Sequence, residues 1–280
     1  MAIGRFDIAR LFGKLPYFPG QDRIIRALYG PDQVFTGKYP AVTRLVNVEG
    51  ATFSCSTNSY LEWAIAVKGG EERGLLKFFL ELCRVNNFDQ FFDVGSNIGY
   101  FALPISQYVR TTCFEPYPLN YNTLKKNISL NPHRNIVSLP VGLSDACGEI
   151  EIHLLNEQGN FGLATMSPPV EGNKTTTEVV DTVVFDKNFA FDNKRLLFKI
   201  DVEGHELKAL EGMKATLAKN LCCIYVETEE HKVPEFLKHL GYSVNAIHHN
   251  LFRDVRQTQS FATGGQGHLI ASNFPINIQK

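Results

Sequence analysis

The sequence has few of the features that mark nucleic-acid-binding, disulfide-bonded or membrane-spanning proteins. Its 280 residues carry a net charge of −1, and only 20% are charged, with no long basic run, which argues against a nucleic-acid partner. The six cysteines form no CxxC pair and no zinc-ligand spacing, and most lie in apolar segments. This usage predicts a reducing, cytoplasmic compartment. Every apolar run ends well short of the roughly 18 residues that a membrane span needs, so we expect no span and no signal peptide.

What the sequence does contain, from residue 86 to residue 280, is a regular alternation of apolar strand patterns with helical patterns. Alternation of this kind predicts an α/β fold, with a mostly parallel sheet that helices cover on both faces. Strands are expected at 89–94, 111–114, 136–141, 149–155, 177–185, 196–202, 221–226, 243–248 and 266–272, and helices at 98–108, 117–130, about 205–219 and 234–240.

Residues 1–85 lack that alternation and are expected to form an N-terminal helical and β extension that packs on the core. A short helix is predicted at 6–12, and prolines and glycines interrupt regular structure over most of 13–41. Short, hairpin-forming strands are expected between residues 42 and 67, with Glu49-Gly50 as the turn. A helical pattern at 74–84 then leads into the first core strand.

The segment FFDVGSNIGY at 91–100 joins an apolar strand to a carboxylate, Asp93, and then to a loop with two glycines, Gly95 and Gly99. Such a loop lets the backbone approach a nucleotide-type ligand closely. It fails the G-x-G-x-x-G spacing of a dinucleotide site, and Asp93 would repel a pyrophosphate, which disfavours an NAD oxidoreductase. A ligand with an ammonium group beside a nucleoside, such as S-adenosylmethionine (SAM), fits better.

A second acid lies at the distance expected for a ribose-binding residue. Glu115 follows the predicted strand 111–114 and comes 22 residues after Asp93, close to the roughly 20 expected between a glycine loop and such an acid. Its two carboxylate oxygens can accept hydrogen bonds from both ribose hydroxyls. Pro116 then ends the strand.

Acidic residues gather where strands of the predicted sheet end. Ligands of parallel sheets bind at the carboxyl ends of the strands, so this placement predicts an active-site cleft. The acids concerned are Asp93, Glu115, Asp145, Asp201, Glu203 and Glu227.

Five segments in this order resemble the FkbM-type family of SAM-dependent methyltransferases: DVGSNIGYF, CFEPYPLNYNTLKKNISLN, VGLSD, FKIDVEGHELKALEGM and IYVET. The resemblance covers about residues 58–272, and Tyr60-Leu61-Glu62 resembles the Tyr-Glu element that often precedes the domain. It implies a Rossmann-like class I methyltransferase fold, with a mostly parallel seven-stranded sheet whose last strand is antiparallel. It also implies O-methylation of a sugar, a polysaccharide building block or a polyketide-type natural product.

The resemblance also implies roles for single residues. Asp93, Gly95, Asn97 and Gly99 would line the methionine half of SAM, and Glu115 would hold the ribose. Asp145, with Ser144 beside it, would face the adenine amino group. The full set of expected cofactor-binding residues is Asp93, Gly95, Ser96, Asn97, Gly99, Tyr100, Glu115, Pro116, Ser144 and Asp145.

Methyl transfer to a hydroxyl needs a group that accepts the alcohol proton while the oxygen is held in line with the carbon–sulfur bond. The expected catalytic residues are Glu203, Asp201, Glu227 and His205, with Glu203 favoured as the base and Glu227 as the residue that orients or shares the proton. A simpler alternative for Glu203 and Glu206 is a favourable interaction with a helix N-terminus. No metal site is predicted, although Mg²⁺ held by these acids is an open alternative.

The acceptor is predicted less closely than the cofactor. A small-molecule or glycan acceptor is favoured, with a protein or peptide side chain as the alternative, and a homo-oligomer is compatible with the sequence. Residues 156–176 are expected to form part of the substrate rim. Within this segment, Ser167-Pro168-Pro169-Val170 resembles the Asn/Asp-Pro-Pro-Tyr motif of amino-group methyltransferases but lacks its aromatic residue, which argues against methylation of an amine. Four aromatic residues could stack on a sugar or belong to the core: Tyr60, Trp63, Phe161 and Tyr242.

Overall fold

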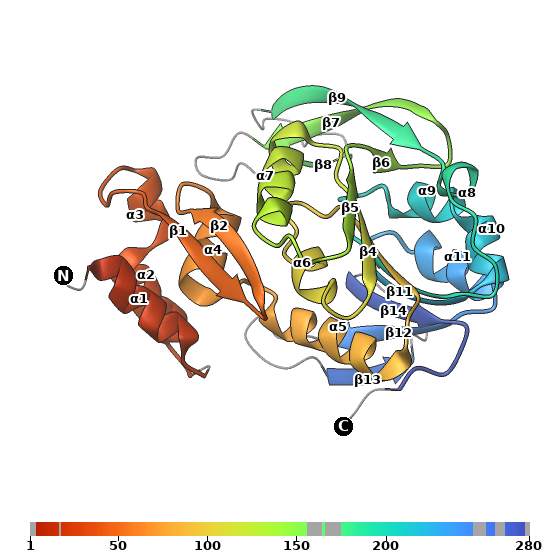
Figure 1. Cartoon of the computed structure of the whole chain (residues 1–280), viewed down its shortest axis with the longest axis horizontal. Coiled ribbons are helices and arrows are strands. Elements are labelled where there is room, and N and C mark those ends of the chain that lie inside the picture. Colours follow the sequence, from red (N-terminus) through yellow and green to blue (C-terminus); the bar gives the residue numbers. More distant parts are fainter. Residues whose placement is uncertain are drawn as a thin grey trace.

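The computed structural model describes residues 4–16, 18–155, 164–165, 175–248, 256–260 and 267–277. Its centre is a sheet in the order β13-β12-β14-β11-β10-β3-β4-β5 (Figure 1). The strands are β3 (Gln90–Val94), β4 (Arg110–Phe114), β5 (Ile136–Leu139), β10 (Arg195–Ile200), β11 (Leu221–Thr228), β12 (Ser243–His248), β13 (Arg256–Ser260) and β14 (Gly267–Ser272).

The pairing within this sheet confirms the expected class of fold. Strands β5, β4, β3, β10 and β11 run parallel to one another, whereas β14 lies antiparallel between β11 and β12. These seven strands form the predicted mostly parallel sheet with an antiparallel last strand. β13 extends the edge beyond β12 and was not predicted. From β3 the chain adds β4 and β5 on one side and later β10 and β11 on the other, so the strand order reverses between β3 and β10. In such folds ligands bind at the carboxyl ends of the strands at this point.

Both faces of the sheet are buried, which explains why its strands are continuous apolar runs. Phe91 belongs to the cluster on one face, beneath α5 (Arg73–Asn86), while its neighbour Phe92 stacks on Phe198 in the cluster on the other face, with ring centroids 4.9 Å apart. The first face also carries α6 (Ala102–Ile105) and α7 (Pro118–Ser129), and the second α8 (Phe185–Asn188), α9 (Glu206–Glu211), α10 (Lys214–Lys219) and α11 (Lys232–His239).

Two helices are shorter than the sequence predicted. The segment 98–108 is helical only over α6, and the helix expected from about 205 to 219 is divided into α9 and α10. The division falls at Gly212, where a Cβ atom would lie 2.1 Å from the carbonyl oxygen of Ser144. The close approach of these two backbones therefore interrupts the helix.

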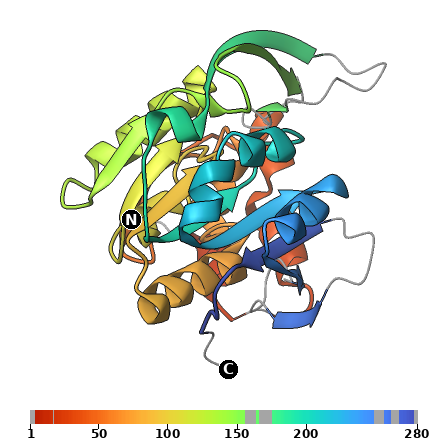
Figure 2. The same ribbon diagram turned by 90° about the vertical axis from the view of Figure 1, so that its right-hand side faces the viewer.

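A smaller sheet lies across the top of the central one in Figures 1 and 2. It contains β6 (Gly142–Leu143), β7 (Gly148–Leu155), β8 (Ala164–Thr165) and β9 (Thr175–Val183), in the order β6-β9-β7-β8. The predicted strands at 149–155 and 177–185 are confirmed as β7 and β9. The second ends two residues early, where α8 begins. Most of the expected substrate rim at 156–176, with the Ser167–Val170 motif, lies outside the described residues.

The N-terminal region is more helical than predicted. The expected helix is α1 (Arg5–Lys14), and the expected hairpin is β1 (Thr43–Val48) with β2 (Ala51–Ser56), turning at Glu49 and Gly50, both with positive φ. The segment expected to be irregular instead contains α2 (Gln21–Tyr29) and α3 (Pro31–Phe35). Residues 60–68, expected in part as strand, form helix α4 (Tyr60–Lys68).

The hairpin is fixed to the core by two asparagines, Asn127 in α7 and Asn131 just after it. Asn127 accepts a hydrogen bond from the Ser54 amide at 3.0 Å, and Asn131 exchanges two hydrogen bonds with the backbone of Thr52. Buried side chains of both regions belong to one continuous cluster. The domain division at 85–86 itself stays a prediction. No helix in the described part of the chain is long and apolar enough to cross a membrane.

Candidate active site

The loop after β3 is held tightly between the ends of its two neighbouring strands. Gly95 has φ +81°, and a Cβ atom there would lie 1.9 Å from the carbonyl oxygen of Asp201, so only glycine fits. The amides of Gly95 and Ser96 both donate to the carbonyl oxygen of Phe114 at 3.0 Å. The loop is thereby fixed at the carboxyl end of the sheet, at the junction of β3, β4 and β10.

Glu115 is fixed by the same loop. One carboxylate oxygen accepts a hydrogen bond from the Asn97 amide at 2.7 Å, and the other accepts one from the Tyr117 amide at 3.0 Å. The side chain is buried, and burial raises its pKa to about 7 despite these hydrogen bonds, which favour the charged form. The Asn120 side chain also hydrogen-bonds this carboxylate, so the carboxylate is oriented before a ligand arrives.

A cavity of about 350 Å³ opens above this loop. Of the expected cofactor-binding residues, six line it: Gly95, Ser96, Asn97, Tyr100, Glu115 and Pro116. The expected catalytic residues Asp201 and Glu203 line it too. Two strand ends, a glycine loop and the predicted acids thus meet at one cavity.

The other expected cofactor-binding residues do not line this cavity. Asp93 is buried just beneath its floor, and Gly99 packs against leucines of α6 and α7. Ser144 donates a hydrogen bond to Asp145 at 3.0 Å and lies 2.9 Å from Nε2 of His205. Since the hydroxyl has one proton, His205 Nε2 must donate to Ser144. Burial, followed by the charge of Lys208, lowers the pKa of His205.

A buried lysine, Lys199, lies on the floor of the cavity among carboxylates. Its ammonium nitrogen is 2.9 Å from Oδ2 of Asp201, and it pairs with Asp93 in the strand register. Burial alone would lower the pKa of Lys199, but the attraction of Asp201, Asp93 and Glu72 outweighs burial and raises it. The lysine is therefore charged. The sequence marks Lys199 as a charged residue in the middle of an apolar strand, where a charge needs a partner.

Asp93 and Glu72 give the floor an excess of acid. Neither carboxylate oxygen of Asp93 has a hydrogen-bond partner among the described residues, and burial raises its pKa to about 6. Glu72 precedes α5 and comes from the N-terminal region; burial raises its pKa to about 7. No sequence motif marked Glu72, because its place in the site depends on how the N-terminal region packs.

Next to the cavity lies an acidic cleft that shares Asp201 and Glu203 with it and adds Glu227 and His268. Burial, followed by Asp201 and Glu72, raises the pKa of Glu227 to about 8. Glu203 has φ +50° and is exposed at the rim, and its pKa is also raised, chiefly by partial burial. His205 lines neither space. Over the described ranges, no group of three or more His, Cys, Asp or Glu residues is arranged to hold a metal ion.

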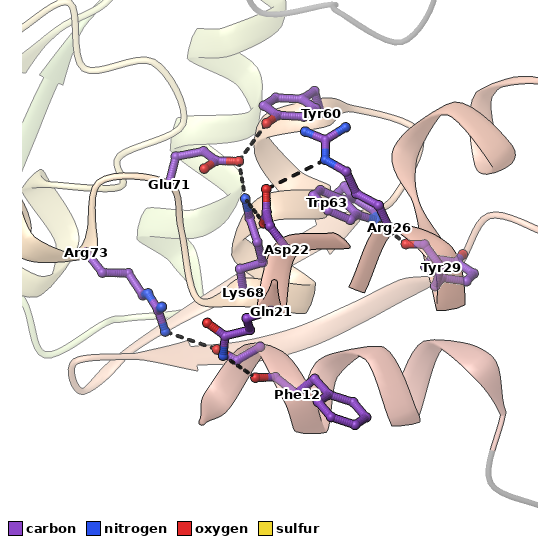
Figure 3. Close-up of polar contacts among 11 residues, drawn as sticks. Phe12, Gln21, Asp22, Arg26, Tyr29, Tyr60, Trp63, Lys68, Glu71 and Arg73 are labelled. Atoms are coloured by element: carbon purple, nitrogen blue, oxygen red, sulfur yellow. Dashed lines mark hydrogen bonds and ion pairs between the residues drawn. The ribbon is translucent and has the colours of Figure 1, made fainter. Parts of the chain in front are cut away.

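Glu206 and the aromatic candidates have clear places. Glu206 is buried and accepts hydrogen bonds from the amides of Val202 and Gly204, so it orders the start of α9. Tyr60 lines the cavity and donates to Glu71 at 2.6 Å (Figure 3). Trp63 and Tyr242 are buried in the core, and Phe161 lies outside the described residues.

Similarity to known proteins agrees with this geometry. Residues 93–262 match the model of the methyltransferase FkbM domain. Hexuronic acid methyltransferase AglP of Haloferax volcanii is 30% identical over 155 residues, which cover 55% of this chain and 61% of that protein. Methyltransferase sdnD of Sordaria araneosa is 29% identical, with 49% of this chain and 65% of that protein covered. The chain therefore spans less than two thirds of the length of either relative.

Among solved structures, methyltransferase FkbM from Methylobacillus flagellatus aligns with 89% of this chain and 60% of its own, with a TM-score of 0.42 and 14% identity. The family model covers more than half of the chain and includes the loop after β3, Glu115 and the acids after β10. The chain belongs to the FkbM methyltransferase family.

Proposed function

We propose that this protein transfers a methyl group from SAM to a hydroxyl of a sugar, a glycan or another small hydroxylated acceptor. The observation that carries the proposal is the cavity at the carboxyl end of the sheet, where Glu115, the loop after β3 and Asp201 meet. The relative that is a hexuronic acid methyltransferase supports a sugar as acceptor.

The residues of the cavity fit SAM in shape and charge. Glu115 offers an oriented carboxylate for the ribose hydroxyls, and the glycine at 95 lets the loop pack against the Asp201 backbone at the cavity. Asp93, Asp201 and Glu72 surround a single cation, Lys199, so the floor keeps a net negative charge when all are ionised. A ligand with positive groups gains from this field, whereas a dinucleotide pyrophosphate is repelled by it. When bound, SAM supplies a methyl group made electrophilic by a sulfonium sulfur.

Glu203 is the proposed base. It lies on the rim that the cavity shares with the acidic cleft, so a hydroxyl presented there is within its reach. Its raised pKa makes it a better proton acceptor than an ordinary glutamate. Glu227, with a pKa near 8, shares or orients that proton. In this proposal His205 supports the loop through Ser144 and leaves the proton transfer to the acids.

Replacing the base tests this role. Glu203→Gln should lower kcat by about 10²–10⁴-fold and leave the Kd for SAM within about twofold, because only proton transfer is lost. Glu229→Gln, at an exposed acid of the same cleft, is the matched control. Full turnover by Glu203→Gln would remove Glu203 from this role.

The first experiment is titration of SAM, S-adenosylhomocysteine and NAD against the wild type, Glu115→Ala and the exposed-acid control Glu149→Ala. We expect both sulfur nucleosides to bind the wild type and the control and to bind Glu115→Ala far more weakly. Methylation is then assayed by mass spectrometry with a methyl glucuronide, a neutral glucoside and a peptide mixture. Binding of NAD alone would refute the cofactor assignment, and methylation of the peptides alone would replace the sugar acceptor by a protein.

A further inference from the structure

A second cavity, of about 620 Å³, lies on the N-terminal side of the active site and has the opposite charge. Five cationic side chains line it, against one acidic side chain, that of Glu49. The cationic residues are Arg10, Lys14, Lys68, Arg73 and Lys77. In a chain with a net charge of −1, beside a cavity rich in carboxylates, such a concentration of positive charge indicates an anionic ligand.

One of the five cations is already neutralised. The ammonium group of Lys68 is buried, 2.6 Å from Glu71 and 3.3 Å from Asp22 (Figure 3). Even when these two acids are counted, positive groups exceed negative ones by two. Arg10, Lys14, Arg73 and Lys77 form no ion pair within the described ranges, and Lys14 and Lys77 are exposed.

The cavity is built from elements that hold these cations in place. Arg73 donates a hydrogen bond to the carbonyl oxygen of Gly13 at 3.0 Å, which ties the start of α5 to the end of α1 (Figure 3). Gly74 and Lys77 of the same helix line the wall, so the positive end of α5 adds to the field. The helix has 14 residues, and no side chain caps its N-terminus. Fixed guanidinium and helix-end donors are the groups that bind carboxylates and phosphates.

The second cavity adjoins the active site through Tyr100. This side chain lines both cavities, and its hydroxyl donates to the carbonyl oxygen of Gly69 at 3.0 Å. A Cβ atom on Gly70 would lie 2.0 Å from that hydroxyl, so the linker between α4 and α5 fits closely around it. The linker contributes Gly69 to the second cavity and Glu72 to the active-site cavity, so both the linker and Tyr100 border the two spaces.

We propose that the second cavity binds an oxyanion group, a carboxylate or a phosphate, of the molecule that is methylated. The assignment of this group to the acceptor rests on the proposed function above, whereas the existence of an anion site does not. The acceptor class is thereby narrowed to anionic saccharides long enough to reach from the active-site cavity to Arg10, Lys14, Arg73 and Lys77.

The test measures binding without any turnover. Trigalacturonate (three carboxylates) and inorganic pyrophosphate are titrated against the wild type and the double variant Lys14→Gln/Lys77→Gln. Lys219→Gln/Lys238→Gln removes the same charge from exposed positions of α10 and α11 and is the matched control. We expect about tenfold weaker binding in the cavity variant and an unchanged Kd in the control, since two of the four cations are lost. Added salt should weaken binding to the wild type.

Each outcome decides the proposal. Binding of trigalacturonate alone identifies a carboxylate ligand, and binding of pyrophosphate alone identifies a phosphate. Absence of both, or equal weakening in the cavity variant and the control, overturns the anion site. The SAM titration is run on the same samples, so a protein that binds trigalacturonate at the cavity but not SAM would refute the proposed function and retain the site. If methylation is observed, the cavity variant should raise KM for an acidic acceptor and leave KM for a neutral glucoside unchanged.

Discussion

The substitution Gly95→Ala tests whether the contact between the glycine loop and β10 shapes the cofactor cavity. Two costs add at this position. Gly95 has φ +81°, which costs a residue with a Cβ atom about 1–2 kcal/mol. The new methyl group would also lie 1.9 Å from the Asp201 carbonyl oxygen, and overpacking against backbone costs about 1–3 kcal/mol more. The expected loss in the free energy of unfolding is therefore about 2–5 kcal/mol.

The chain offers a control that isolates the second cost. Gly241, in the turn between α11 and β12, has φ +86°, and a Cβ atom there would meet nothing within 4 Å. Gly241→Ala should therefore cost only the conformational term, about 1–2 kcal/mol. The difference between the two variants measures the contact with Asp201.

Urea denaturation of both variants, with SAM titration of the folded proteins, provides the assay. We expect Gly95→Ala to be less stable than Gly241→Ala and to bind SAM at least about tenfold more weakly, because the loop and the end of β10 must separate. Equal stability of the two variants together with wild-type SAM affinity would show that the loop accepts a side chain, and would refute the geometric argument.

Three further predictions concern other parts of the molecule. Asn127→Ala leaves two buried backbone groups without hydrogen-bond partners and should lower the free energy of unfolding, measured by urea denaturation, by about 2–4 kcal/mol. The control Asn122→Ala, at an exposed position of the same helix, should lower it by less than about 1 kcal/mol. Lys68→Met leaves the carboxylates of Asp22 and Glu71 without their shared cation and should lower the free energy of unfolding by about 3 kcal/mol. An unchanged urea denaturation curve would show that these ion pairs do not stabilise the fold. In the folded state the pKa of Glu72 is about 7 and that of Glu227 about 8, whereas an unperturbed glutamate has a pKa of 4.5. The folded state therefore binds these protons more tightly than the unfolded state, and the free energy of unfolding should fall as pH rises from about 5 to 8. A profile that rises over this range, or one that Glu72→Gln leaves equally steep, would contradict these assignments.

The parallel sheet was predictable because its strands are buried on both faces. Runs such as Phe91-Phe92 have side chains in the clusters of both faces, which leaves little doubt between a strand and a loop. The acids after the strands were predictable for a related reason. Parallel strands all end at one edge, so Asp93, Glu115 and Asp201 had to come together once the alternation was recognised.

The N-terminal helices were not predictable from the same signals. Residues 63–67 (WAIAV) are buried on all sides, and such an all-apolar run does not distinguish a helix from a strand. Gly30-Pro31 marked a break correctly, since α2 ends at Tyr29 and α3 begins at Pro31, but it did not indicate the helices on either side. Proline occupies the first turn of α3, where its missing amide costs nothing. In both places, tertiary packing determines the element.

The N-terminal region also contributes to the candidate active site. The family match begins at Asp93, but Ser59, Tyr60 and Glu72 also line the cavity that contains Glu115. Glu71 accepts the hydrogen bond of Tyr60 and contacts buried Lys68, so α2, α4 and the start of α5 hold this wall as one unit. The linker between α4 and α5 contributes Glu72 to the first cavity and Gly69 to the second, so a change in its sequence should affect the proposed cofactor side and the proposed acceptor side together. Acceptor specificity is therefore expected to depend in part on residues before 93, a region that the family model does not cover.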